Sequence, residues 1–149
     1  MNLFGLMETS GSAMQAERIR AEVVAANMAN AETTRTESGG PYKRQHVVFA
    51  ANAGFGETMH KARLGLSGEA EPAGGVHIAA VIEDTSPAMK RYDPGHPDAG
   101  PDGYVAYPDI NPLTEMVDLM GATRAYGLNS SAVQAEKGMI ASALDIARS

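Results

Sequence analysis

A long stretch at the C-terminal end of the chain, residues 112–149, constrains the fold most. It follows Asn111-Pro112, an asparagine that can cap free backbone N–H groups and a proline whose fixed φ suits the first helical position. No further proline interrupts the stretch, and Glu115 near its start and Arg148 near its end both suit the helix dipole. As one helix it measures about 55 Å at ~1.5 Å per residue, more than a small domain needs. The sequence therefore predicts a long helix that needs neighbours.

Apolar and small residues form two seams along this predicted helix. The first seam contains Met116, Leu119, Tyr126, Val133, Ile140 and Leu144. The second seam contains Leu113, Val117, Met120, Leu128, Ser131, Ala135, Met139, Ser142 and Ile146. Heptad spacing, which the first seam keeps from Leu119 to Ile140, is typical of a coiled coil, and two seams predict contacts on more than one side. The longest core helix of an ordinary bundle is the alternative.

A second helix is predicted over residues 1–30, ending by about residue 32. Its apolar and small residues recur at helical spacing, whereas its charged residues are predicted on a solvated outer face. Asn27 and Asn30 lie a turn apart at its end and can cap it or hydrogen-bond a partner's backbone. The apolar stripe contains Leu3, Met7, Ser10, Met14, Ala21, Val24 and Met28, and the charged set is Glu17, Arg18, Arg20 and Glu22.

The middle of the chain differs from both ends in composition. Residues 50–75 are rich in Ala, Gly and Glu without a sustained period, which predicts a long flexible loop. Residues 92–103 contain three of the eight prolines and exclude regular structure. Three short strands are predicted, over residues 42–49, 76–82 and 104–107.

The predicted fold is α+β and mainly α. Two long terminal helices pair as an antiparallel coiled coil, with a small, irregular, β-rich insertion between them. The predicted division is an N-terminal helix in residues 1–34, a middle segment in residues 35–111 and a C-terminal helix in residues 112–149.

Composition excludes several classes of function. The chain has 149 residues, a net charge of −6 and no basic cluster, which argues against nucleic-acid binding. It contains no cysteine, so neither disulfides nor thiolate metal sites can form. No apolar run reaches the length of a membrane span. The N-terminus lacks a cleavable secretory signal, so we expect a cytosolic protein or one that leaves by a route that does not read such a signal.

One acidic and histidine-containing cluster invites a metal hypothesis. Asp93, His96, Asp98 and Asp102 could offer ligands to a hard cation. Their spacing matches no EF-hand or zinc pattern, and the prolines among them limit convergence, so solvated turn residues are the favoured interpretation. No nucleophile motif or phosphate-binding glycine loop accompanies them. The sequence therefore predicts no enzyme, no cofactor and no metal site.

Four stretches carry a family resemblance: VVAANMANAETT (23–34), GGPYKRQHVVF (39–49), YDPGHPDAGPDGYVAYPDIN (92–111) and RAYGLNSSAVQAEKGM (124–139). Together they resemble the flagellar basal-body rod proteins, of the proximal-rod type. The resemblance implies a structural subunit without catalytic activity, polymerising into the proximal rod that transmits torque from motor to hook. Its terminal helices would line the axial structure as a coiled coil, with the middle segment facing outward.

The resemblance also implies partners and a location. The flagellar type III export apparatus would carry the chain, without a cleavable signal peptide, to the periplasmic part of the basal body. There it would assemble with other rod subunits, with the basal-body adaptor and with itself, in an open helical stack. The implied subunit interface contains Leu3, Met7, Met14, Val24, Asn27, Met28, Asn30, Leu113, Met116, Leu119, Met120, Tyr126, Leu128, Val133, Ile140 and Leu144.

Two alternatives stay open at this point. One is an export-linked adaptor or chaperone-like helical protein, which would keep the helices but form no ordered stack. The other is a small secreted metal-dependent hydrolase that uses Asp93, His96 and Asp98.

Overall fold

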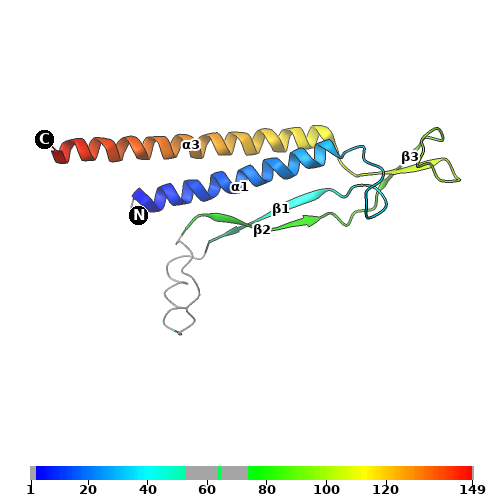
Figure 1. The fold of residues 1–149 in the computed structure, drawn as a ribbon, viewed down its shortest axis with the longest axis horizontal. Coiled ribbons are helices and arrows are strands. Elements are labelled where there is room, and N and C mark those ends of the chain that lie inside the picture. Colours follow the sequence, from blue (N-terminus) through cyan, green and yellow to red (C-terminus); the bar gives the residue numbers. More distant parts are fainter. Residues whose placement is uncertain (1–2, 53–63, 65–73, 149) are drawn as a thin grey trace. The chain divides into compact units, whose positions relative to one another are not determined.

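Two long helices pack against each other in opposite directions, and a small strand-rich segment connects them in the sequence (Figure 1). The computed structural model describes residues 3–52, 64 and 74–148. The helices are α1 (Leu3–Ala29) and α3 (Pro112–Arg148), and the strands are β1 (Gln45–Ala51), β2 (Val76–Glu83), β3 (Met89–Tyr92) and β4 (Tyr104–Tyr107). The predicted mainly α fold with two paired terminal helices is confirmed.

The start of α3 follows the predicted capping chemistry. The Oδ1 of Asn111 accepts a hydrogen bond from the backbone N–H of Leu113 at 3.0 Å, and the Asn111 carbonyl accepts one from the Glu115 N–H at 3.1 Å. The Asn111 side chain therefore satisfies one of the free N–H groups at the helix start, and its carbonyl accepts the first regular helical bond, which fixes where the helix begins.

The end of α1 is closed by Asn30. Its Nδ2 donates to the Ala26 carbonyl at 2.9 Å, and its Oδ1 accepts from the Thr33 hydroxyl at 3.1 Å. The backbone N–H of Thr33 also donates to the Asn30 carbonyl at 3.0 Å. The Ala31 N–H donates to the Met28 carbonyl at 3.3 Å, so the regular bonding of the helix gives way to tighter i→i−3 bonds here. The helix therefore ends before residue 32, as the sequence predicts.

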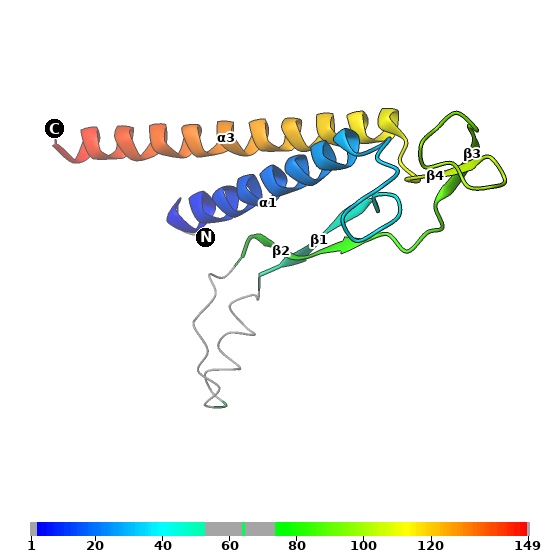
Figure 2. The same cartoon turned by 45° about the vertical axis from the view of Figure 1, so that its right-hand side comes forward.

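The strands form two separate two-stranded sheets, β1 with β2 and β3 with β4 (Figure 2). In the antiparallel β3–β4 pair, Met89 lies opposite Tyr107 and Tyr92 opposite Tyr104. The predicted strands 76–82 and 104–107 are confirmed.

Two features of the insertion differ from the sequence prediction. β1 begins at Gln45 rather than at residue 42, since the backbone N–H of Tyr42 donates to the Thr33 carbonyl at 3.0 Å, outside the sheet. β3 was not predicted, because its four residues are all exposed and show no alternating pattern. Of the predicted loop 50–75, Ala50 and Ala51 belong to β1, and residues 53–63 and 65–73 lie outside the described residues.

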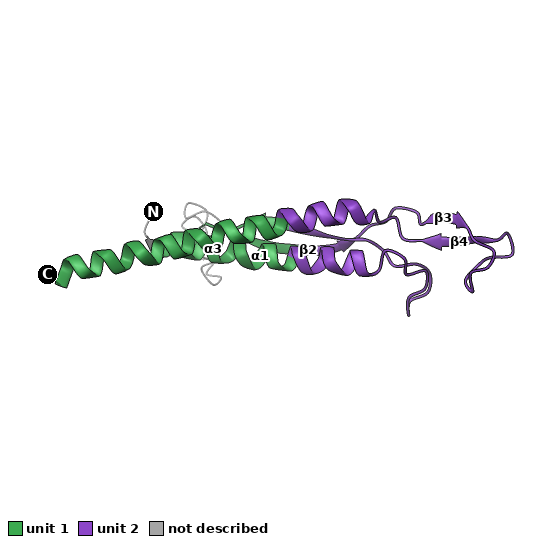
Figure 3. Ribbon diagram, turned by 90° about the horizontal axis from the view of Figure 1, so that it is seen from above, with its two compact units in different colours: residues 1–19, 49–79, 122–149 green, residues 20–48, 80–121 purple. Residues whose placement is uncertain are grey.

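The chain divides into two compact units, and both long helices contribute to each of them (Figure 3). The first unit contains residues 1–19, 49–79 and 122–149. In it, Ala16 and Ala122 are buried, and the Ser12 hydroxyl of α1 accepts a hydrogen bond from the Val76 N–H of β2 at 3.2 Å. Small buried side chains allow close helix packing but remove little apolar surface from water.

The second unit contains residues 20–48 and 80–121. Its buried apolar side chains are Val24, Val105, Tyr107 and Ile110. The guanidinium of Arg91 lies 3.9 Å from the centre of the Tyr107 ring and donates to the Tyr107 hydroxyl at 2.6 Å. This cation–π contact fixes the β3–β4 pair, which is too small to be stable by itself.

Candidate functional site

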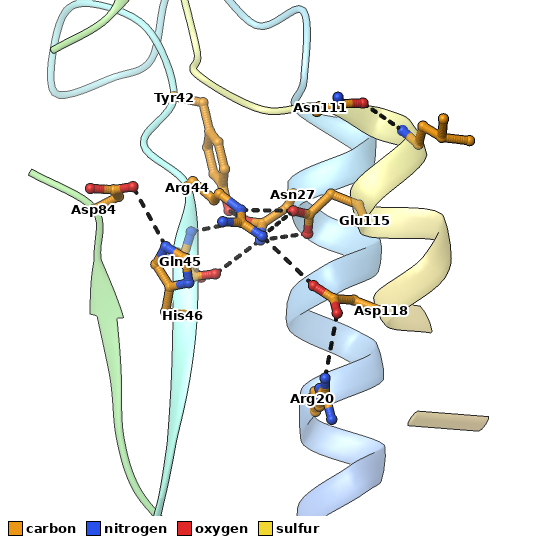
Figure 4. Close-up of polar contacts among 11 residues, drawn as sticks. Arg20, Asn27, Tyr42, Arg44, Gln45, His46, Asp84, Asn111, Glu115 and Asp118 are labelled. Atoms are coloured by element: carbon orange, nitrogen blue, oxygen red, sulfur yellow. Dashed lines mark hydrogen bonds and ion pairs between the residues drawn. The ribbon is translucent and has the colours of Figure 1, made fainter. Parts of the chain in front are cut away.

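A buried ion pair joins the start of α3 to the residue before β1 (Figure 4). Glu115 is 1% exposed, and its Oε1 accepts hydrogen bonds from Arg44 Nε at 2.7 Å and from an Arg44 terminal nitrogen at 2.6 Å. All of these groups lie in the second unit. A carboxylate taken out of water in this way is stable only with a paired cation and satisfied lone pairs.

Asn27 completes this pair from α1. Its Nδ2 donates to Glu115 Oε2 at 3.1 Å and to the Gln45 carbonyl at 2.9 Å, while its Oδ1 accepts from the Gln45 N–H at 2.9 Å and from the Tyr42 hydroxyl at 3.3 Å. The side-chain amide therefore bonds both backbone groups of Gln45, as a neighbouring strand would. At 1% exposure, Asn27 connects α1, α3 and β1 in one network.

Asp118 extends the network to the outer part of α1. Its carboxylate lies 3.7 Å from Arg44 and 3.5 Å from Arg20. The prediction that Arg20 lies on a solvated face is wrong, since its side chain is only 34% exposed and faces Asp118 of α3. These longer, partly exposed pairs contribute little free energy individually, so the stabilising part of the network is the Arg44–Glu115–Asn27 core.

Burial raises the pKa of the Tyr42 phenol above its ordinary value of 10.0, and the carboxylates of Glu83 and Glu115 raise it further. The folded state therefore favours the neutral phenol. The contribution of Tyr42 to the free energy of unfolding should be undiminished below about pH 10 and should fall as the pH rises through the folded pKa.

We expect Tyr42→Phe to have a lower free energy of unfolding than the parent at about pH 8, because it loses a hydrogen bond. The difference between the two should narrow at about pH 11. Urea denaturation at both pH values measures this, and a constant gap would contradict it.

Hydrogen bonds from Ser86 lower the pKa of Asp84 below its ordinary value of 3.8. The Ser86 N–H donates to Asp84 Oδ1 at 2.9 Å and the Ser86 hydroxyl at 2.8 Å, and His46 adds a weaker effect from 3.5 Å. The backbone N–H of Asp84 donates to the Arg44 carbonyl at 2.7 Å. Asp84 therefore ends β2 and holds it beside the ion-pair residue.

The residues of the candidate metal cluster form hydrogen bonds within turns and contacts with Thr34 and Arg35. Asp98 accepts from the Thr34 hydroxyl at 2.8 Å and faces Arg35 at 3.7 Å, and its backbone N–H donates to His96 Nδ1 at 3.1 Å. The Asp93 carbonyl accepts from the His96 N–H, and Asp102 Oδ1 accepts from the Tyr104 N–H. Among the described residues, no group of three His, Cys, Asp or Glu side chains is arranged to hold a metal ion.

The two predicted seams of α3 lie in different environments. Every residue of the second seam is exposed, with exposed fractions of 69% at Leu113, 68% at Met120, 67% at Leu128 and 76% at Ile146. In the first seam, Leu119, Val133 and Ile140 are half-buried. The second seam therefore forms a continuous face of α3 that the subunit leaves open to solvent, and the first seam is partly closed.

The predicted interface residues occupy three environments. Val24 and Asn27 are buried, and Met7, Met14, Met28, Asn30, Leu119, Val133 and Ile140 are half-buried. Leu113, Met116, Met120, Tyr126, Leu128 and Leu144 are exposed. Leu3 begins α1, and its side chain lies outside the described set. The interface assignment of these residues stays a prediction.

Comparison with known proteins gives the family. Residues 7–35 match the family described as flagella basal body rod protein, and residues 102–146 match the family described as flagellar basal body rod FlgEFG protein C-terminal. The flagellar basal-body rod protein FlgC of Bacillus subtilis (strain 168) is 38% identical over 152 residues, covering 99% of this chain and 100% of that protein. The chain belongs to the FlgC family of flagellar basal-body rod proteins.

Other FlgC proteins agree with this assignment. That of Borreliella burgdorferi is 37% identical, and that of Salmonella typhimurium (strain LT2) is 34% identical, each covering 98% of both chains. This member of the FlgC family is therefore a structural rod subunit of the flagellar basal body, and the predicted resemblance is confirmed. The adaptor and hydrolase alternatives have no support. Within the described residues, neither helix has a segment apolar enough to span a membrane.

The buried network uses both segments that match rod families, since Asn27 lies in residues 7–35 and Glu115 in residues 102–146. From the sequence, Glu115 is expected only as a residue that suits the helix dipole, and no role is predicted for Arg44. One signal was available. Glu115, Ala122, Asn129 and Glu136 repeat at intervals of seven, interleaved with the first seam, and all four are buried or half-buried. A search for apolar residues alone passes over this series.

Proposed function

We propose that this FlgC-family subunit polymerises through its terminal helices into the proximal rod, in an open helical stack that transmits torque from motor to hook. The observation that carries the proposal is the exposed second seam. Its large apolar residues from Leu113 to Ile146 leave more than half of each side chain in water. An apolar face that runs the length of a helix marks a protein contact.

Glycines on α3 support the same face-to-face packing. A Cβ added at Gly127 or Gly138 would meet nothing within 4 Å in the subunit, so its own packing does not require glycine there. Each glycine costs a helix about 1 kcal/mol relative to alanine. Close approach of a neighbouring backbone in the rod gives these positions a reason to lack a side chain.

The three sequence segments take different roles in this proposal. The helices in residues 1–34 and 112–149 form the axial contacts, and the β-rich segment in residues 35–111 faces away from the axis. The partners are other rod subunits, further copies of the chain and the basal-body adaptor. The role is structural and not catalytic, and the site of assembly is the periplasm, reached through the flagellar type III export apparatus.

Removal of residues 1–30 should block export and leave the product inside the cell. We assign the export information to this N-terminal segment, and the extent of the deletion follows the helical pattern of α1. The measurement compares culture supernatant, cell pellet and isolated basal bodies in a strain whose only copy is truncated. A full-length copy in the same strain is the control and should restore motility. Normal export of the truncated chain would contradict the proposed export role of this segment. Absence of the full-length protein from wild-type basal bodies would contradict the proposed rod function itself.

A further inference from the structure

Glu136 is a buried carboxylate that has no ion-pair partner among the described residues. It is 6% exposed, and its Oε2 has no hydrogen-bond partner among the described residues. An ionised carboxylate in this position is expensive, because protein groups do not replace the water that it loses. A buried unsatisfied group in a native structure therefore requires a reason.

Glu115 shows how the same helix face satisfies an equivalent group. The two glutamates belong to the series that repeats at intervals of seven, so they lie on one side of α3. Glu115 receives the guanidinium of Arg44 and the amide of Asn27. Glu136 receives neither a cation nor an amide from the part of the chain that the structure describes.

The position of Glu136 says where a partner can reach it. It is the last buried residue of α3, Ile140 is half-buried, and residues 141–148 are exposed without interruption. That end carries two large apolar side chains, Leu144 at 58% and Ile146 at 76% exposure. Any element that covers residues 141–148 brings its side chains to within one or two turns of Glu136.

We propose that a second copy of this chain packs over residues 141–148 of α3 and places a lysine or arginine side chain on the Glu136 carboxylate. The inference rests on the proposed function, since it names a specific contact of that assembly. The chain has suitable cations to offer. Arg35 is 80% and Lys43 64% exposed, and their carboxylate partners lie 3.7 Å and 3.8 Å away. Exposed pairs of this kind are weak, so either cation can change partner at little cost.

Substitution of Glu136 separates this role from one inside the subunit. In the isolated chain, Glu136→Leu should keep or raise the thermal denaturation midpoint, because it removes an unpaired buried charge. In a strain whose only copy is Glu136→Leu or Glu136→Gln, the yield of basal bodies should fall at least about tenfold, the effect of ~1.4 kcal/mol on a contact. Gln134→Leu, two residues away and exposed, is the matched control and should assemble normally.

A lower midpoint for Glu136→Leu would place its partner within the subunit and overturn the proposal, as would normal yield in both Glu136 variants. In that second case both variants still assemble into basal bodies, so the proposed function would stand without this contact. A photo-crosslinking residue at Ile146 in assembled basal bodies identifies the occupant. A product joining two copies of this chain supports the proposal, and a product with a different protein, or none, overturns it.

Discussion

Arg44→Ala is expected to lower the free energy of unfolding of the subunit by about 3–5 kcal/mol. The substitution removes the guanidinium that donates to Glu115 at 2.6 and 2.7 Å. It leaves that carboxylate, which is 1% exposed in the intact subunit, with only the Asn27 amide as a hydrogen-bond partner among the described residues. A loss of this size approaches the whole stability of a small domain. Since the described part of the chain buries few large apolar side chains, little remains to offset it. Thermal denaturation followed by circular dichroism measures the loss.

Two further variants show whether the buried pair is the cause. Arg35→Ala removes an arginine that is 80% exposed and 3.7 Å from its partner, so it should change stability by less than about 0.5 kcal/mol. The double variant Arg44→Met with Glu115→Leu should recover most of the loss, because apolar groups of similar size replace both charges. Equal losses in the Arg35 and Arg44 variants would show that the network carries no special stability.

The elements of this fold could be predicted because each has a local signal. α3 begins at an asparagine cap and proline, and β2 is an apolar run between glycines and a turn, so both appear where the sequence places them. β3 has no such signal, because its residues are exposed and its order comes from Tyr107 and the other residues of β4. Local patterns identify elements whose stability is local, and they miss elements that depend on a distant partner.

The candidate site was harder to predict for the same reason. Asn27 was singled out at the helix end, but its partners Gln45 and Glu115 lie 18 and 88 residues away in the sequence. No spacing rule joins such distant residues. The seven-residue repeat that includes Glu115 and Glu136 is visible in the sequence, yet a search for apolar seams ignores acidic residues. The missed information was therefore which polar residues are buried, and that follows only from the packed structure.

A charge on the second seam should abolish assembly and leave the subunit intact. Leu128 is 67% exposed, so Leu128→Asp removes few contacts within the subunit and should change its stability by no more than about 1 kcal/mol. In the proposed rod the same position is covered by a neighbour, where an unpaired carboxylate costs several kcal/mol. The contact recurs at every copy in a helical stack, so the defect is repeated along the rod.

The matched control for Leu128→Asp is Gln134→Asp, which introduces the same charge at an exposed position of α3 outside the second seam. It should support motility and a normal yield of basal bodies, whereas Leu128→Asp should give neither. Val133→Asp cannot replace the seam variant, because Val133 is half-buried and the change also destabilises the isolated chain. Measurements of secretion and of thermal denaturation for each variant show whether a loss of motility comes from failed export or failed folding instead of failed assembly. A motile Leu128→Asp strain, or a Gln134→Asp strain that is equally defective, would mean that the rod contacts lie on another face of α3.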